Sequence, residues 1–161
     1  MTNVTSSKFT LTLPSDTEIL ITREFSAPRR LVFEAMTRPE HVTRWWGPRS
    51  MKLILCEMDV RVGGGYRFVL RGPDGNDFGF RGVYREIVPP ERVVSTFEFE
   101  GMPGHESVET LTLVETAGKT ILTCRCLYQS VEDRDGHLHS GMENGTRESH
   151  DRLEALIATL A

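Results

Sequence analysis

The sequence contains little cysteine and no long apolar segment. Its three cysteines cannot all pair within one chain, and a chain of 161 residues can bury a core without disulfides. No run approaches the ~20 apolar residues that span a bilayer. Met1–Ser7 is polar where a signal peptide would be apolar. We therefore expect reduced thiols, no membrane association and a cytoplasmic location.

Concentrated charge is also missing. Charged residues make up 26% of the chain and give a net charge of −4, with acids and bases interspersed. No block dense in Lys and Arg could neutralise a row of phosphates, so nucleic acid is not an expected partner. The composition is that of a folded protein, and no linker or internal repeat divides it. We expect a single domain over residues 1–161, with residues 1–7 flexible.

Catalytic and cofactor motifs are absent from the sequence. It holds no His-Glu-x-x-His, nucleophile elbow, Walker loop or dinucleotide fingerprint, and the glycines at 63–65 are not followed by the Lys-Ser/Thr of a phosphate site. His137 and His139 are too few ligands for a metal. Cys124 and Cys126 share one face of a strand and could share a metal, although small core side chains are the favoured interpretation. We predict neither a cofactor nor a metal.

Period-two alternation of apolar residues is the main pattern that is present. It covers most of residues 8–129 and predicts β-strands, with two stretches of helical spacing between them. The helical stretches begin at Pro28 and Pro39, and the second runs through Trp45 to Gly47-Pro48. Beyond Ser130 the spacing predicts one long helix that covers an antiparallel sheet, and the fold class is α+β. Strands are predicted over residues 9–13, 19–25, 51–60, 66–70, 78–85, 93–100, 107–116 and 119–129.

Two segments resemble a known family. They are ITREFSAPRRLVFEAMTRPEHVTRWWGP over residues 21–48 and SGMENGTRESHDRLEALIATL over residues 140–160. With the order of elements, they resemble the START-like helix-grip (SRPBCC) superfamily, in the branch named after the activator of 90 kDa heat-shock protein ATPase. The resemblance implies a curved antiparallel sheet, two short helices inserted after the first strand, and a long C-terminal helix across the sheet with a pocket beneath it. It also implies ligands such as lipids, polyketides or plant hormones, or chaperone partners and a role in the stress response, and the fold does not choose among them.

Aromatic residues recur on strand faces that should look toward the final helix. They either line a cavity or fill a core. Glycine in a helix costs about 1 kcal/mol relative to alanine, so Gly141 and Gly145 indicate that room is being kept, as does Gly82 within the aromatic row. Close packing of the helix on the sheet, or an unwound helix start, is the alternative explanation. The aromatic residues are Phe68, Phe80, Tyr84, Phe97 and Phe99.

Arg23 and a tryptophan pair complete the predicted lining. Arg23 shares the alternation of Ile19 and Phe25, so it is expected to face inward, where it either anchors a ligand's polar end or meets a carboxylate. Trp45 and Trp46 are expected to divide, one in the core and one available to a ligand or a protein partner. The predicted ligand-binding residues are Arg23, Trp45, Trp46, Phe68, Phe80, Tyr84, Phe97, Phe99, Met142 and Gly145.

Three functions are compatible with these features. The first is binding of a small hydrophobic ligand, lipid-like or aromatic, in a cavity between the C-terminal helix and the sheet. The resemblance implies a second, a chaperone-associated interaction module, although the Asn-rich, Trp-containing motif by which eukaryotic activators contact the chaperone is not found here. The third is a cofactor-free enzyme similar to polyketide cyclases, with Tyr84, Arg23 and His150 as first candidates. No catalytic residue is assigned, and homodimer formation stays open.

Overall fold

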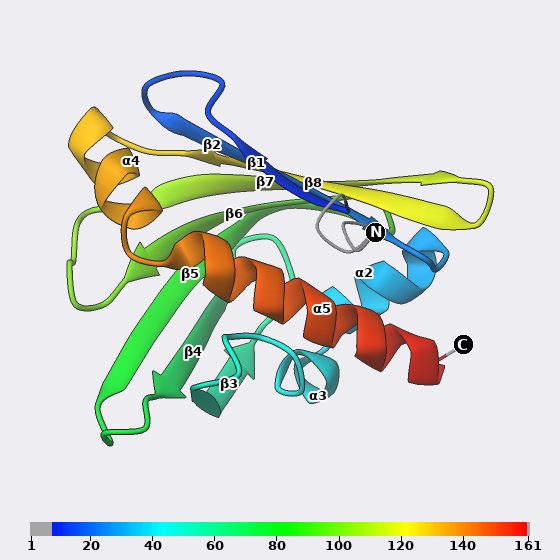
Figure 1. Ribbon diagram of the computed structural model, residues 1–161, viewed down its shortest axis with the longest axis horizontal. Coiled ribbons are helices and arrows are strands. Elements are labelled where there is room, and N and C mark those ends of the chain that lie inside the picture. Colours follow the sequence, from blue (N-terminus) through cyan, green and yellow to red (C-terminus); the bar gives the residue numbers. More distant parts are fainter. Residues whose placement is uncertain (1–7, 161) are drawn as a thin grey trace, which may run out of the picture.

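The computed structural model describes residues 8–160, so the expectation for residues 1–7 lies outside the described part of the chain. Eight strands form one antiparallel sheet that curves around the last helix (Figure 1). The strand order is β1-β2-β8-β7-β6-β5-β4-β3, which is the predicted α+β arrangement. The strands are β1 (Phe9–Thr12), β2 (Glu18–Phe25), β3 (Lys52–Met58), β4 (Gly65–Arg71), β5 (Asp77–Val88), β6 (Arg92–Phe99), β7 (Ser107–Thr116) and β8 (Lys119–Leu127). The helices are α2 (Arg29–Thr37), α3 (Pro39–Val42), α4 (Val131–Leu138) and α5 (Met142–Leu160).

Two short helices, α2 and α3, connect β2 to β3. They follow the second strand, not the first, because the short β1 pairs in front of β2 as a hairpin. Helix α3 begins with Pro39 at its first position, as predicted, but it ends at Val42 and not beyond Trp45. The amides of Trp45 and Trp46 both donate to the carbonyl oxygen of Val42, so turns carry the chain onward from there.

Strand β3 contains an irregularity that reverses part of its alternation. Simple alternation predicts that Ile54, Cys56, Met58 and Val60 share one face. The pairing register with β4 shifts between Leu53 and Leu55, so Ile54 is the extra residue and its side chain is 38% exposed. Leu53, Cys56 and Met58 pack against the core instead.

The segment beyond Ser130 forms two helices where one long helix was predicted. Gly141 adopts a φ of +90°, a left-handed conformation that glycine accepts readily and that ends a helical path. The chain therefore changes direction between α4 and α5 (Figure 1). Gly141 lies in this turn, before α5 begins, and so it does not share a helix with Gly145. This agrees with the alternative explanation of an unwound helix start.

Helix α5 is buried through its C-terminal part only. All of its buried residues lie from Ser149 onward. Leu153, Leu156 and Ile157 are at most 5% exposed and pack in the main core with α2 and the sheet. The first two turns of α5 extend beyond this core toward α4 (Figure 1).

Arg23 fixes this packed part of α5 to β2. Its side chain faces inward, as the alternation predicted, and is 3% exposed. Nη1 donates to Asp151 at 2.7 Å and Nη2 donates to Glu154 at 2.9 Å, and both carboxylates belong to α5. The second Glu154 oxygen accepts from the amide of Ser26 at 3.0 Å, just after β2 ends. Arg23 therefore meets carboxylates, which was one of the two alternatives for it.

Replacing Arg23 by Met should lower the free energy of unfolding by about 2 kcal/mol, because it deletes charge-assisted hydrogen bonds inside the fold. The loss stays below that of a fully buried pair because Asp151 and Glu154 are about a third exposed. Denaturant unfolding followed by circular dichroism measures it. Arg81→Met is the matched control: Arg81 is 55% exposed in its pair with Glu98, so a loss below about 0.5 kcal/mol is expected. Equal losses in the two variants would contradict the assignment.

Candidate functional site

A cavity of about 810 Å³ lies between the concave face of the sheet, α4 and the first turns of α5. All buried residues of α5 lie from Ser149 onward, and Met142, Gly145 and Thr146 in its first turns line the cavity. The exposed lining residues mark its mouth, which lies between the β6–β7 connection and α4. They include Met102, His105, Glu132 and Gly136.

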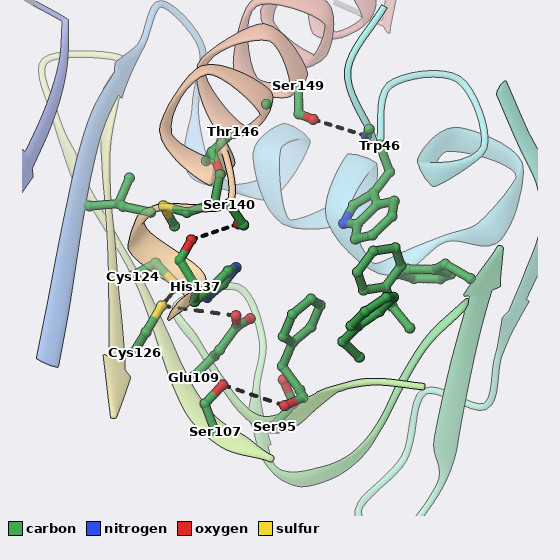
Figure 2. Close-up of a pocket in the computed structure, with 18 of the residues that line it drawn as sticks. Trp46, Ser95, Ser107, Glu109, Cys124, Cys126, His137, Ser140, Thr146 and Ser149 are labelled. Carbon is green, nitrogen blue, oxygen red and sulfur yellow. Dashed lines mark hydrogen bonds between the residues drawn. The ribbon is translucent and has the colours of Figure 1, made fainter. Parts of the chain in front are cut away.

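Aromatic side chains from the α3–β3 connection and from three adjacent strands form one wall (Figure 2). The ring of Trp46 lies 4.9 Å from that of Phe68 and 5.4 Å from that of Phe80, measured between centroids. Phe80 stacks on Phe97 at 5.6 Å, and Phe99 lies 5.4 Å from Phe80. These offset and edge-to-face contacts hold the rings in fixed positions.

The residues proposed from the sequence as ligand-binding lie around this one cavity, with one exception. Trp45, Trp46, Phe68, Phe80, Tyr84, Phe97, Phe99, Met142 and Gly145 all belong to its lining. Arg23 does not, because Asp151 and Glu154 hold its guanidinium against α5. Its guanidinium is therefore engaged within the fold and is not placed to contact a ligand in this cavity.

The two tryptophans divide as predicted. Trp45 is 5% exposed, and its indole Nε1 donates to the carbonyl oxygen of Ala35 at 2.9 Å, which ties the α3–β3 connection to α2. Trp46 is half-buried and its ring lies against the aromatic wall. Its indole is directed into the cavity (Figure 2). Trp46 therefore forms part of the cavity wall.

The glycines serve different purposes. A Cβ at Gly82 would lie 2.0 Å from the carbonyl oxygen of Thr96 and 2.5 Å from the ring of Tyr66, so this glycine admits the Tyr66 ring and leaves no space for a ligand. A Cβ at Gly145 would meet nothing within 4 Å. Of these two glycines, only Gly145 keeps room in the cavity.

A carboxyl group, that of Glu109, stands in the middle of the concave face. The strand register aligns Tyr84, Ser95, Glu109 and Cys126 in one row across β5, β6, β7 and β8, and all four line the cavity. Figure 2 shows the Glu109 carboxylate turned into the open space. Within residues 8–160, no Lys, Arg or His forms an ion pair with it, and its one side-chain partner is the Cys126 thiol at 3.9 Å. Burial raises the pKa of Glu109 to about 7.

Two histidines reach the cavity in neutral form. His137 Nδ1 lies 2.5 Å from the hydroxyl of Tyr128, its ring stacks on Phe97 at 5.8 Å, and burial lowers its pKa. His150 is 6% exposed between aromatic rings, and burial, followed by the charge of Arg23, lowers its pKa to about 3. Its Nδ1 has no hydrogen-bond partner among the described residues.

The cysteine pair borders the same space. Cys124 and Cys126 point to one face, with their sulfur atoms 4.0 Å apart. The hydrogen bond with Cys124, burial and the charge of Glu109 hold the pKa of Cys126 well above its usual value. Both side chains contribute thiols to the lining. In the described part of the chain, no three His, Cys, Asp or Glu side chains gather as a metal site would require.

Glu109 was missed from the sequence, although a signal for it exists. In β7 the inward positions are Ser107, Glu109, Leu111 and Leu113, so the carboxylate interrupts the apolar face of an alternating strand. Attention to this face, and not only to aromatic residues, would have identified it.

Comparison with known proteins places the chain in a family. The sequence model of the family described as "Activator of Hsp90 ATPase homolog 1-like protein" matches residues 26–158. The chain belongs to this family. The activator-homolog-like fold is the helix-grip arrangement that the sequence resemblance implied. Among curated proteins, none matches the chain. No helix in residues 8–160 is long and apolar enough to cross a membrane.

Solved structures of bacterial proteins share the fold over nearly the whole chain. A Rhodobacter sphaeroides protein is 27% identical, with a TM-score of 0.87 over 94% of this chain and 99% of its own. Protein NE0264 from Nitrosomonas europaea is 24% identical, with a TM-score of 0.81 over 92% and 98%. The AHSA1 protein from Silicibacter pomeroyi is 21% identical, with a TM-score of 0.72 over 89% and 99%.

Glu109→Gln should stabilise the protein more at pH 8 than at pH 5. Folding raises the pKa of Glu109 from 4.5 to about 7, so its contribution to stability is fully present below 4.5 and is lost as pH rises through 7. The carboxyl group is only half-buried because it faces the cavity, so we expect a gain of about 1–2 kcal/mol at pH 8. Urea unfolding at the two pH values measures it, and an equal gain at both would count against the assignment.

Proposed function

We propose that this activator-homolog-like protein binds a small, largely apolar molecule in the cavity between α5 and the sheet. The observation that carries the proposal is an 810 Å³ space bordered by fixed aromatic rings, a size typical of small-molecule sites. A domain of this length can fill its core completely, and here α5 is held away from the strands at one end. Gly145, where a side chain would meet only open space, supports the same conclusion.

The chaperone-association hypothesis depended on an exposed tryptophan contact. Trp46 packs against Phe68 and Phe80 inside the cavity, which supports the ligand-binding hypothesis instead. The name of the family refers to ATPase activation.

A cofactor-free enzyme is the second candidate, and Glu109 is the observation that favours it. A carboxyl group with a pKa of about 7 inside an apolar cavity can both take up and release a proton at neutral pH. Of the residues first considered, Arg23 does not line the cavity, and Tyr84 holds its proton because burial raises its pKa. The enzyme hypothesis predicts chemical conversion of a bound molecule, which Glu109→Gln abolishes while binding persists.

Gly145→Leu should remove ligand binding without destabilising the protein. The new side chain enters the open space beneath α5, while loss of a helical glycine contributes up to about 1 kcal/mol of stability. The measurements are native mass spectrometry of the purified protein for a retained small molecule, and thermal shifts with a library of apolar compounds. Compounds that raise the melting temperature of the wild type should leave that of Gly145→Leu unchanged.

Gly145→Ala is the matched control for this variant. It makes the same change to helix propensity but adds one carbon, so most of the cavity and the ligand response should survive. The proposal fails if the wild type retains no molecule and responds to no compound, or if the Leu variant responds as the wild type does.

A further inference from the structure

The lining of the cavity carries negative charge without fixed positive charge. Its acidic residues are Glu109, Glu132 and Asp133, and none of its lining residues within 8–160 is Lys or Arg. At the mouth, Asp133 is already bonded to His105 at 2.8 Å. Glu109 lies inside and has no cationic partner among the described residues. Glu132 is exposed to solvent at the mouth, so Glu109 is the carboxyl group inside the cavity that has no cationic partner among residues 8–160.

The titratable groups around Glu109 do not supply a positive charge that could pair with its carboxylate. Burial and the charge of Glu109 hold the pKa values of Tyr66 on β4 and Tyr128 on β8 far above neutrality, and Cys126 on β8 behaves likewise. These groups keep their protons at pH 7. From α4, His137 is neutral because burial lowers its pKa. A cation that pairs with the ionised form of Glu109 is therefore not supplied by the described residues around it.

The wall of the cavity suits the same kind of ligand. Aromatic faces attract cations through the ring quadrupole, and tryptophan is the strongest of them. Trp46, Phe80 and Phe97 line the cavity on the side formed by the α3–β3 connection, β5 and β6, and Phe97 stacks on both Phe80 and His137.

We propose that the ligand of this cavity is an organic cation, a protonated amine or nitrogen heterocycle carried on an apolar, aromatic body. The charged nitrogen lies at Glu109 and the body lies against the wall formed by Trp46, Phe80 and Phe97. This inference rests on the proposed function and specifies its ligand class. Anionic lipids and fatty acids are disfavoured in this cavity, because their carboxylate or phosphate would meet Glu109 without a Lys or Arg to offset it.

Three tricyclic probes of matched shape test the charge preference. At pH 8, 9-aminoacridine is a cation, acridine is neutral and acridine-9-carboxylate is an anion. Binding is measured by calorimetry and by quenching of tryptophan fluorescence, since Trp46 borders the site. We expect the cation to bind at least about tenfold more tightly than acridine, and the anion to bind most weakly.

Glu109→Gln should reduce the affinity for 9-aminoacridine at least about tenfold and that for acridine less than about twofold. In the wild type, the affinity for the cation should fall about fivefold to tenfold from pH 8 to pH 6 as Glu109 gains a proton, and the Gln variant should show no such dependence. Glu132→Gln at the exposed mouth is the matched control, and this variant should still bind 9-aminoacridine more tightly than acridine. Thermal melts verify that each variant is folded.

The inference is overturned if 9-aminoacridine binds no tighter than acridine, if Glu109→Gln keeps the preference, or if none of the three probes binds. The last result leaves the proposed function to be judged separately, by the retained molecule and the response of Gly145→Leu. If all three probes bind with similar affinity, the result refutes the proposal of a cationic ligand but supports the proposal that the cavity binds a small apolar molecule.

Discussion

The whole site depends on where α5 is fastened. The ion pairs of Arg23 with Asp151 and Glu154, together with Leu153 and Ile157 in the core, hold the C-terminal part of the helix on the sheet. The N-terminal part has no fully buried residue and contacts the fold through Met142 and through Arg147 over the ring of Phe9, and the turn at Gly141 directs it toward α4. When one end of a helix is fixed on a curved sheet, the distance between the helix and the strands grows toward the other end. Side chains there are too short to fill the space, and a cavity remains.

The chemistry of that space comes from a contrast between many apolar rings and a few polar groups. Rings that contact one another have little freedom to fill the volume by rotation, so the space stays open. In such surroundings a carboxyl group is poorly solvated, and this is why the pKa of Glu109 lies near neutrality. Because burial and, for Cys126, the hydrogen bond with Cys124 shift their pKa values, Tyr66, Tyr128, Cys126 and His137 keep their uncharged forms around it. Glu109 is therefore the one group of the interior row whose ionisation changes near physiological pH.

Much of this architecture could be predicted from residue patterns. Alternation identified the strands and the aromatic row, and it placed Arg23 inward, because side chains in a strand alternate strictly between two faces. The errors arose where one residue changes the geometry. The extra residue Ile54 shifts a register, and Gly141 breaks a helix through a backbone angle that spacing alone does not reveal. Gly82 was taken as empty space because the sequence does not show that the ring of Tyr66 occupies it.

The cross-sheet row of Tyr84, Ser95, Glu109 and Cys126 has a consequence for how this fold diversifies. Each position is a single side chain on a separate strand, held by main-chain ladders that do not depend on its identity. Exchanging one of them alters polarity at one point along the cavity and leaves the scaffold in place. Proteins with this backbone can therefore acquire new ligand preferences through isolated point changes in the row, which accords with a shared fold at sequence identities of 21 to 27%.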